Sequence, residues 1–291
     1  MIKEYLKKNR ETIDAALKWL FSGKAPASQT LSEAMQYSLL AGGKRIRPSL
    51  FLLVLEVLGQ DSSSFVTEAC ALECVHTYSL IHDDLPGMDN DDYRRGKLTN
   101  HKVFGTGTAI MAGDGLLTAA FEILSRSRLP AETRCRLIEL LAAAAGPNGM
   151  VGGQVLDIEA EKKALSLDEL KFMDYCKTGC LLCAPVDMAA VIGEATLRER
   201  ECLHAFGIHL GLLFQITDDL LDENGHLDEM GKQPGKDREE HKSTYVTILG
   251  KEKALEMAKE EAMKAWQCLC LPGRDTSLLN ELVEFILHRT A

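Results

Sequence analysis

The chain has 291 residues, of which 46% are hydrophobic and 26% charged, a composition typical of a globular protein with a large core. Its formal net charge of −10 disfavours a nucleic-acid-binding protein, which is usually basic. Aromatic residues make up only 6%, and the frequent alanine, leucine, glutamate and lysine favour helices over strands. No linker rich in proline, glycine or serine divides the chain, so we expect one domain spanning residues 1–291.

Helical periodicity dominates from one end of the chain to the other, and no sustained alternation of apolar and polar residues predicts a sheet. Short breaks that contain glycine or proline separate the helical segments. The expected fold class is therefore all-α, a single large antiparallel helical bundle with functional sites in its middle. The predicted helices are 3–21, 31–41, 45–58, 64–84, 108–126, 131–145, 149–161, 168–192, 197–223, 243–268 and 276–289.

The N-terminal stretch is charged and amphipathic, unlike a secretory signal, and the nine cysteines are scattered, which predicts reduced thiols in a cytoplasmic protein. The motif CLLC at 180–183 has zinc-like spacing, but no second Cys/His pair stands beside it, so buried helix cysteines are favoured. The longest uncharged stretch, 140–156, is interrupted by glycine, proline and asparagine. We therefore expect an interrupted core helix there and no stable membrane insertion.

The first acidic cluster lies in the motif DDLPGMD, at the end of an apolar helix. A Pro-Gly pair separates Asp83 and Asp84 from Asp89, and proline ends or kinks a helix because it removes a hydrogen bond and clashes with the preceding turn. We expect the helix to stop near Asp84, so that Asp89 returns towards Asp83. A helix C-terminus also favours a bound cation.

The second cluster lies in FQITDDLLD, where Asp218, Asp219 and Asp222 have the spacing i, i+1 and i+4. The first and third carboxylates share one helix face. The apolar segment before them argues against a solvated acidic helix end. Both clusters share the pattern Ile-x-Asp-Asp-Leu, and we expect the two helix ends to face each other across one cavity.

Neither cluster contains histidine or cysteine, so both offer oxygen ligands alone, which suit a hard cation. Mg²⁺ typically takes one or two carboxylates together with substrate phosphates and water. Ca²⁺ is disfavoured because no EF-hand spacing is present. The clusters therefore predict Mg²⁺ ions around a phosphate group.

Basic residues flank the acidic clusters at helix ends and glycine turns. Arginine binds phosphate oxygens in pairs and lysine acts as a point charge. Adjacent side chains on a regular backbone point in different directions, so Arg94 and Arg95 could each bind a different anion. This predicts two separate phosphorylated substrates. The basic residues are Lys44, Arg45 and Arg47 in GGKRIRP, Arg94 and Arg95 in YRRG, Lys177 in YCKTGC, Lys232 and Lys236 in GKQPGKD, and Lys242 in HKSTY.

Together and in this order, GGKRIRP, DDLPGMD, FQITDDLLD and GKQPGKD resemble the motifs of the trans-isoprenyl diphosphate synthases. The likeness extends from about residue 30 to 250 by motif, and the first acidic motif looks like that of bacterial farnesyl and plant-type geranylgeranyl diphosphate synthases. The chain departs from the family's usual pattern at Thr106 and Val246, positions to which we assign no chemistry. The resemblance implies an isoprenoid-synthase bundle around a central substrate cavity.

The resemblance also implies roles for individual residues. The Mg²⁺ ligands would be Asp83, Asp84, Asp89, Asp218, Asp219 and Asp222. The allylic diphosphate would be bound by Arg94, Lys177 and Lys232, and isopentenyl diphosphate by Lys44, Arg47, His76 and Arg95. The developing carbocation would face Thr178 and Gln215.

The implied reaction is the Mg²⁺-dependent condensation of isopentenyl diphosphate with dimethylallyl and geranyl diphosphates to farnesyl diphosphate. The resemblance further implies about three Mg²⁺ ions per site and a homodimer that packs through residues 105–145. Geranylgeranyl diphosphate synthesis is the alternative. A terpene cyclase is disfavoured by the second acidic motif, and a non-catalytic subunit of a heteromeric synthase by the presence of both motifs.

Tyr78 is the predicted determinant of product length. It lies five residues before Asp83 on the same predicted helix, and one helical turn rises about 5.4 Å, similar to the length of one isoprene unit. A bulky ring at this depth would close the pocket for the hydrocarbon tail at about C15.

Overall fold

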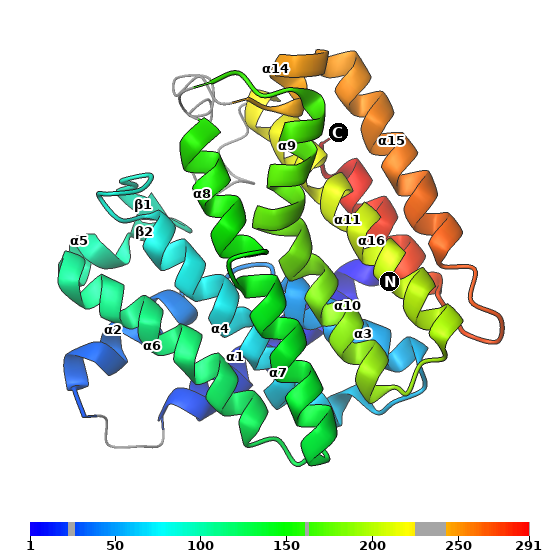
Figure 1. Ribbon diagram of the computed structural model, residues 1–291. Helices are drawn as coiled ribbons and strands as arrows, with labels where there is room; N and C mark the ends of the chain where they lie inside the picture. The colour runs from blue at the N-terminus through cyan, green and yellow to red at the C-terminus, as the bar shows by residue number, and fades with distance from the viewer. Residues whose placement is uncertain (23–26, 161–162, 225–242, 291) are drawn as a thin grey trace. The chain divides into compact units, whose positions relative to one another are not determined.

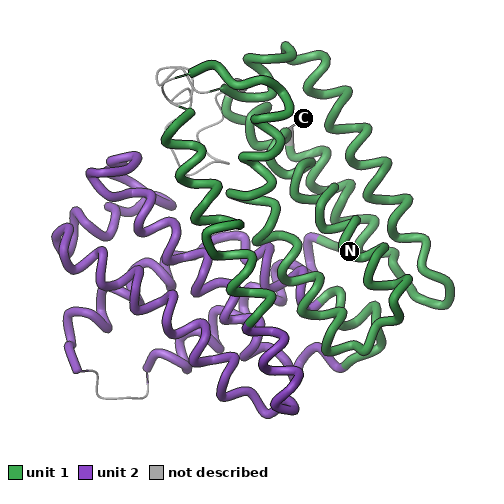
Figure 2. The backbone as a smooth tube through the Cα atoms, viewed as in Figure 1, with its two compact units in different colours: residues 1–2, 53–60, 139–291 green, residues 3–52, 61–138 purple. Residues whose placement is uncertain are grey.

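The computed structural model describes residues 1–22, 27–160, 163–224 and 243–290, which are mostly helical (Figure 1). Internal contacts divide the chain into two compact units (Figure 2). Unit 1 comprises residues 1–2, 53–60 and 139–291, and unit 2 comprises residues 3–52 and 61–138. The predicted all-α fold class is confirmed, while the single domain over residues 1–291 stays a prediction.

Unit 2 is built around α4 and α6, which pack along each other and are both contacted by α2. One face of α6 is fully buried through small and apolar residues at helical spacing, among them Ala109, Ala112 and Leu116. The helices with most of their length in unit 2 are α1 (Ile2–Ser22), α2 (Gln29–Leu39), α3 (Ile46–Val57), α4 (Val66–Asp83), α5 (Asn100–Phe104), α6 (Thr106–Ser125) and α7 (Ala131–Ala145, shared with unit 1).

A short antiparallel hairpin, absent from the sequence prediction, follows the first acidic motif. Its strands β1 (Tyr93–Arg94) and β2 (Lys97–Leu98) pair Tyr93 with Leu98. The connecting residues Arg95 and Gly96 both have positive φ, 53° and 73°, as a two-residue turn of this twist requires. The hairpin thus holds two arginines at fixed positions in unit 2.

In unit 1, the long helix α11 contacts α10, α15 and α16. Ser166 and Glu169 form a capping box at the start of α9, which explains why that helix begins where it does. The elements of unit 1 are α8 (Met150–Ala160), α9 (Leu167–Asp174), η2 (Tyr175–Gly179), α10 (Cys180–Ile192), α11 (Leu197–Asn224), α14 (Tyr245–Leu249), α15 (Lys251–Cys268), α16 (Ser277–Leu287) and η3 (His288–Thr290).

Two predicted helices are interrupted in the structure. The prediction 243–268 contains α14 and α15, which are separated at Gly250, a residue with φ of 82°. The segment predicted as one helix, 168–192, is helical throughout, but a single π-helical turn, η2, separates α9 from α10. The interruption expected within 140–156 is confirmed, because α7 ends at Ala145 and α8 begins at Met150.

Two helical stretches are long and apolar enough to span a membrane, namely Thr106–Ser125 and Leu167–Ile192. In the first, 33% of the tested window is buried inside the protein, and in the second 67%. Buried core helices of soluble proteins have the same length and composition, so these stretches are weak support for a membrane span.

Candidate active site

The first acidic motif turns back on itself at the end of α4. The helix ends at Asp83, Asp84 caps it, and the Asp89 backbone N–H donates to the Asp83 carbonyl oxygen at 2.9 Å. The return of Asp89 towards Asp83, expected from the intervening Pro-Gly pair, is therefore confirmed for the backbone. Asp83 and Asp89 are both partly exposed.

Asp84 differs from these two residues, because it is only 3% exposed. Its Oδ1 accepts a hydrogen bond from Arg94 Nε at 2.9 Å and a second from Arg94 Nη2, which also donates to Asp91 at 3.3 Å. This pairing fixes Arg94 beside the acidic motif. The role of Asp84 as a Mg²⁺ ligand stays a prediction.

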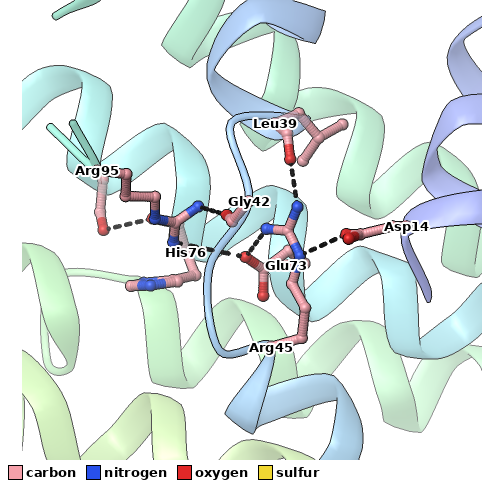
Figure 3. Close-up of polar contacts among 8 residues, drawn as sticks. Asp14, Leu39, Gly42, Arg45, Glu73, His76 and Arg95 are labelled. Atoms are coloured by element: carbon pink, nitrogen blue, oxygen red, sulfur yellow. Dashed lines mark hydrogen bonds and ion pairs between the residues drawn. The ribbon is translucent and has the colours of Figure 1, made fainter. Parts of the chain in front are cut away.

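Figure 3 shows a second group of charged residues in unit 2, which includes Arg95 and His76, two of the residues expected to bind isopentenyl diphosphate. Arg95 Nη1 donates to the Gly42 carbonyl oxygen, and Arg95 Nη2 lies 3.9 Å from Glu73 Oε1. Arg45 Nη1 donates to the same Glu73 oxygen. Glu73 was not among the predicted site residues, although a glutamate inside the apolar run ACALECV is a signal of a specific role.

The remaining predicted residues of this group are spread over the same part of unit 2. Lys44 is exposed in the segment before α3, and Arg47 lies in the first turn of that helix. His76 lies on α4, one turn after Glu73. Burial holds the pKa of His76 well below its ordinary value, and the nearby arginines, Arg47 first, lower it further. The lowered pKa favours the neutral imidazole of His76.

In unit 1, the π-helical turn η2 carries Lys177 and Thr178. Such turns insert an extra residue into a helix and are common at functional sites. Lys177 Nζ lies 2.6 Å from Asp157 Oδ2 on α8. No sequence pattern predicts a role for Asp157, because it stands 20 positions from Lys177 in the chain.

Thr178 and Gln215, both expected to face the carbocation, contact each other, and their role towards the carbocation stays a prediction. The Thr178 hydroxyl donates to Gln215 Oε1 at 3.2 Å. Helix α11 can approach η2 this closely because both backbones carry glycine, and a Cβ on Gly211 would lie 3.0 Å from the Gly179 Cα. Gln215 Nε2 in turn donates to Asp219 Oδ1 at 3.2 Å.

Asp219 is 8% exposed and its second oxygen also has a protein donor, the Tyr245 backbone N–H at 2.9 Å. It therefore connects α11 to α14, and its role as a Mg²⁺ ligand stays a prediction. Asp218 is different, because 48% of its side chain is exposed. Asp222 is partly exposed on the same helix. Lys232 lies outside the described residues.

Arg289, near the C-terminus, is an unpredicted neighbour of the second motif. Its guanidinium lies 3.3 Å from Asp218 Oδ1, donates to Thr217 Oγ1 at 2.9 Å and stacks 4.0 Å from the centre of the Phe214 ring. Nothing in the local sequence of Arg289 predicted this contact, which joins residues 72 positions apart.

Asp174 is a buried carboxyl group at the end of α9. Burial raises the pKa of Asp174 to about 7, with Asp157 and Asp218 adding to the rise and Tyr245 and Lys177 opposing it. Because the folded-state pKa exceeds the ordinary value of 3.8, ionisation of Asp174 destabilises the folded protein as pH rises from about 4 to 7.

We expect Asp174→Asn to raise the melting temperature more at pH 8 than at pH 5, since the amide stays neutral where the carboxyl ionises. Thermal denaturation across this pH range measures the difference. Asp168→Asn, at an exposed position of the same helix, is the control and should keep the wild-type slope. Parallel pH profiles for wild type and Asp174→Asn would contradict the expectation.

The donor set of both motifs fits Mg²⁺, because every candidate side-chain ligand is a carboxylate oxygen. Within the described residues, no three histidine, cysteine, aspartate or glutamate side chains gather into a ready metal site. Mg²⁺ sites in phosphate-transferring proteins use few protein ligands and are completed by substrate oxygens. The partly exposed Asp83, Asp89 and Asp218 suit such sites.

Comparisons with known proteins agree with these motifs. The polyprenyl synthetase family model matches residues 28–279. The farnesyl diphosphate synthase of Geobacillus stearothermophilus is 46% identical over 97% of both chains. The chloroplastic geranylgeranyl pyrophosphate synthase of Capsicum annuum is 43% identical over 99% of this chain and 78% of its own. A solved geranyltransferase of Helicobacter pylori, complexed with magnesium and isoprenyl diphosphate, has a TM-score of 0.85 at 34% identity and covers 98% and 95% of the two chains.

Proposed function

Because the chain belongs to the polyprenyl synthetase family and is thereby a prenyltransferase, we propose that it makes farnesyl diphosphate. It condenses isopentenyl diphosphate head to tail, first with dimethylallyl and then with geranyl diphosphate, and releases diphosphate. The observation that carries this assignment is the 46% identity, over nearly the whole chain, to a farnesyl diphosphate synthase. The 43% identity to a geranylgeranyl pyrophosphate synthase makes one further elongation step the alternative.

Mg²⁺ would be held by Asp83 and Asp89 in the first motif and by Asp218 and Asp222 in the second, with about three ions per active site. When bound, it supplies positive charge that stabilises the departing diphosphate. The presence of magnesium in a related geranyltransferase supports this cofactor. Asp84 and Asp219 act in this proposal as buried supports, since each is paired within its own unit.

Lys177 and Arg94 bind the allylic diphosphate as its carbon–oxygen bond breaks, and Lys232 is proposed to assist them. The isopentenyl double bond then attacks the allylic carbon, and the released diphosphate takes the proton that is lost. Arg94 and Lys177 are held for this task by carboxylates, at 2.9 Å from Asp84 and 2.6 Å from Asp157. The side chains of Arg94 and Lys177 are thus held in place before the substrate binds.

Thr178 and Gln215 stabilise the carbocation through oriented dipoles. The Thr178 O–H donates to Gln215, and the Gln215 amide donates to the Asp219 carboxylate. Hydrogen bonds in such a chain polarise one another, so the negative charge of Asp219 increases electron density on the Thr178 oxygen. That oxygen keeps its lone pairs for the cation because its proton is directed towards Gln215.

A diphosphate-release assay with chromatography of the products tests the function. With Mg²⁺, isopentenyl diphosphate and dimethylallyl diphosphate, we expect diphosphate release that requires both substrates and a C15 product. A C20 product would indicate geranylgeranyl diphosphate synthesis. Release from a long allylic substrate alone would indicate a cyclase, and no turnover a non-catalytic subunit.

Tyr78→Ala is expected to shift the product from C15 towards C20 or longer, measured by chromatography of the dephosphorylated products. Tyr78 is buried on α4 and packs edge-on against His82, with ring centres 5.6 Å apart. Burial, together with the charge of nearby Asp83, raises the pKa of Tyr78 to about 12. Removing the ring would lengthen the space for the tail.

Tyr78→Phe is the matched control, because it keeps the ring and should keep the C15 product. An unchanged product profile in Tyr78→Ala, in a variant that still folds, would remove Tyr78 as the determinant of length.

We also propose a cytoplasmic homodimer without stable membrane insertion. The net charge of −10 and the scattered cysteines support the compartment. The outer side of α6, with Ile110 and Met111 at 36% and 52% exposure, supports packing of two copies through residues 105–145. Light scattering after size-exclusion chromatography would measure the mass of the assembly, and a monomer at micromolar concentration would contradict it.

A further inference from the structure

Helix α4 buries two glutamates, and they have different neighbours. Glu68 and Glu73 are 5% and 1% exposed. Glu68 accepts a hydrogen bond from the Ser127 hydroxyl. Glu73 accepts one from Arg45 and lies 3.9 Å from Arg95, with the same oxygen serving both. A buried carboxylate is costly unless it is paired, so Glu73 is stable there because two guanidinium groups surround it.

All three nitrogens of the Arg45 guanidinium donate hydrogen bonds to groups inside the protein. Besides Glu73, Arg45 donates to Asp14 Oδ1 at 2.8 Å and to the Leu39 carbonyl oxygen at 2.6 Å, and it is 2% exposed. It has a positive φ of 50°, which a non-glycine residue adopts only when its surroundings hold it. Arg45 therefore cannot reach a substrate, but it fixes the backbone between Lys44 and Arg47.

Arg95 is anchored by the same group and yet remains accessible. Its side chain is 20% exposed, and it donates to the Gly42 carbonyl oxygen. Gly43 makes this approach possible, because a Cβ there would lie 2.6 Å from Arg95 Cζ. Burial lowers the pKa of Arg95, Glu73 opposes that fall and Arg45 adds to it. Glu73 thus offsets the repulsion between two neighbouring guanidinium groups.

We propose that Glu73 is a positioning residue for isopentenyl diphosphate: it orients Arg95 directly and, through Arg45, the segment that carries Lys44 and Arg47. This inference rests on the proposed function, because it assigns Glu73 to the isopentenyl half of that reaction. Glu73 does not touch the substrate. Its effect should fall on one substrate, because Glu73 pairs with Arg95, which is expected to bind isopentenyl diphosphate, and with Arg45, which stands between Lys44 and Arg47 in the chain.

The test compares Glu73→Gln with Glu68→Gln, two changes of a buried glutamate on one helix. KM is measured separately for isopentenyl diphosphate and for geranyl diphosphate, and binding of isopentenyl diphosphate alone is measured by calorimetry. We expect Glu73→Gln to raise KM and Kd for isopentenyl diphosphate about tenfold, the usual size of a coupling between contacting charged groups. The KM for geranyl diphosphate should change by less than about twofold. Glu68→Gln should leave both KM values at the wild-type level.

A double-mutant cycle with Arg95→Gln adds a readout that a purely structural role would not move. If Glu73 acts through Arg95, the two changes together should raise KM for isopentenyl diphosphate by less than the product of their separate effects. Should Glu73→Gln fail to fold, Glu73→Asp keeps the charge but withdraws it by one methylene, and it should raise the same KM.

Equal changes in both KM values, no change in either, or the same change in Glu68→Gln would overturn the inference. Failure of the proposed function would look different, because the wild-type protein itself would then not consume isopentenyl diphosphate with geranyl diphosphate.

Discussion

Asp83→Asn is expected to lower kcat by about 10³-fold, equivalent to about 4 kcal/mol of transition-state stabilisation. Asp83 ends α4, where the negative end of the helix dipole adds to its own charge and favours a cation. An amide is a much weaker ligand for Mg²⁺ than a carboxylate. Steady-state rates at saturating substrate, measured over a range of Mg²⁺ concentrations, provide the test.

The matched control for Asp83→Asn is Asp92→Asn, a nearby change of an aspartate that is 59% exposed and pairs with Lys102 at 2.7 Å. It should keep kcat within about twofold, because exposed ion pairs contribute little. Full activity in Asp83→Asn, or in wild-type protein treated with EDTA, would contradict the assigned role of the first acidic motif.

Arg45→Met is expected to lower the free energy of unfolding by about 3–5 kcal/mol, since it leaves a buried charge without its closest partner. Glu73 is 1% exposed and would keep Arg95, at 3.9 Å, as its remaining ion-pair partner among the residues that the structure describes. Asp14 and the Leu39 carbonyl oxygen would also lose a donor. Urea denaturation followed by circular dichroism measures the loss.

Arg126→Met is the control for this change, because Arg126, the C-cap of α6, forms an exposed pair with Glu122 of that helix, with exposures of 63% and 49%. Its expected cost is below about 1 kcal/mol. If Arg45→Met lowered the free energy of unfolding no more than Arg126→Met does, the buried contacts of Arg45 would contribute no more than an exposed ion pair.

Local patterns predicted most of the helices because their causes are local. The Pro-Gly pair in DDLPGMD was enough to predict the end of α4 and the return of Asp89, and both are present. The hairpin at 93–98 was missed, because strands of two residues are too short for an alternating pattern. The break at Gly250 was missed because an isolated glycine does not by itself end a helical pattern, and its φ of 82° is known only from the folded backbone.

The sequence by itself determined the helical class, the positions of the two acidic motifs and the family to which they point. Only the tertiary structure decided which charged side chains are paired. Asp84 pairs with Arg94, and Lys177 pairs with Asp157. Asp219 accepts hydrogen bonds from Gln215 and from the Tyr245 backbone N–H. The physical reason is that helical periodicity depends on neighbours within about four residues, whereas a buried charge is stabilised by partners much farther along the chain. Arg45 and Glu73 are 28 positions apart, so no pattern within a few residues could predict that they pair.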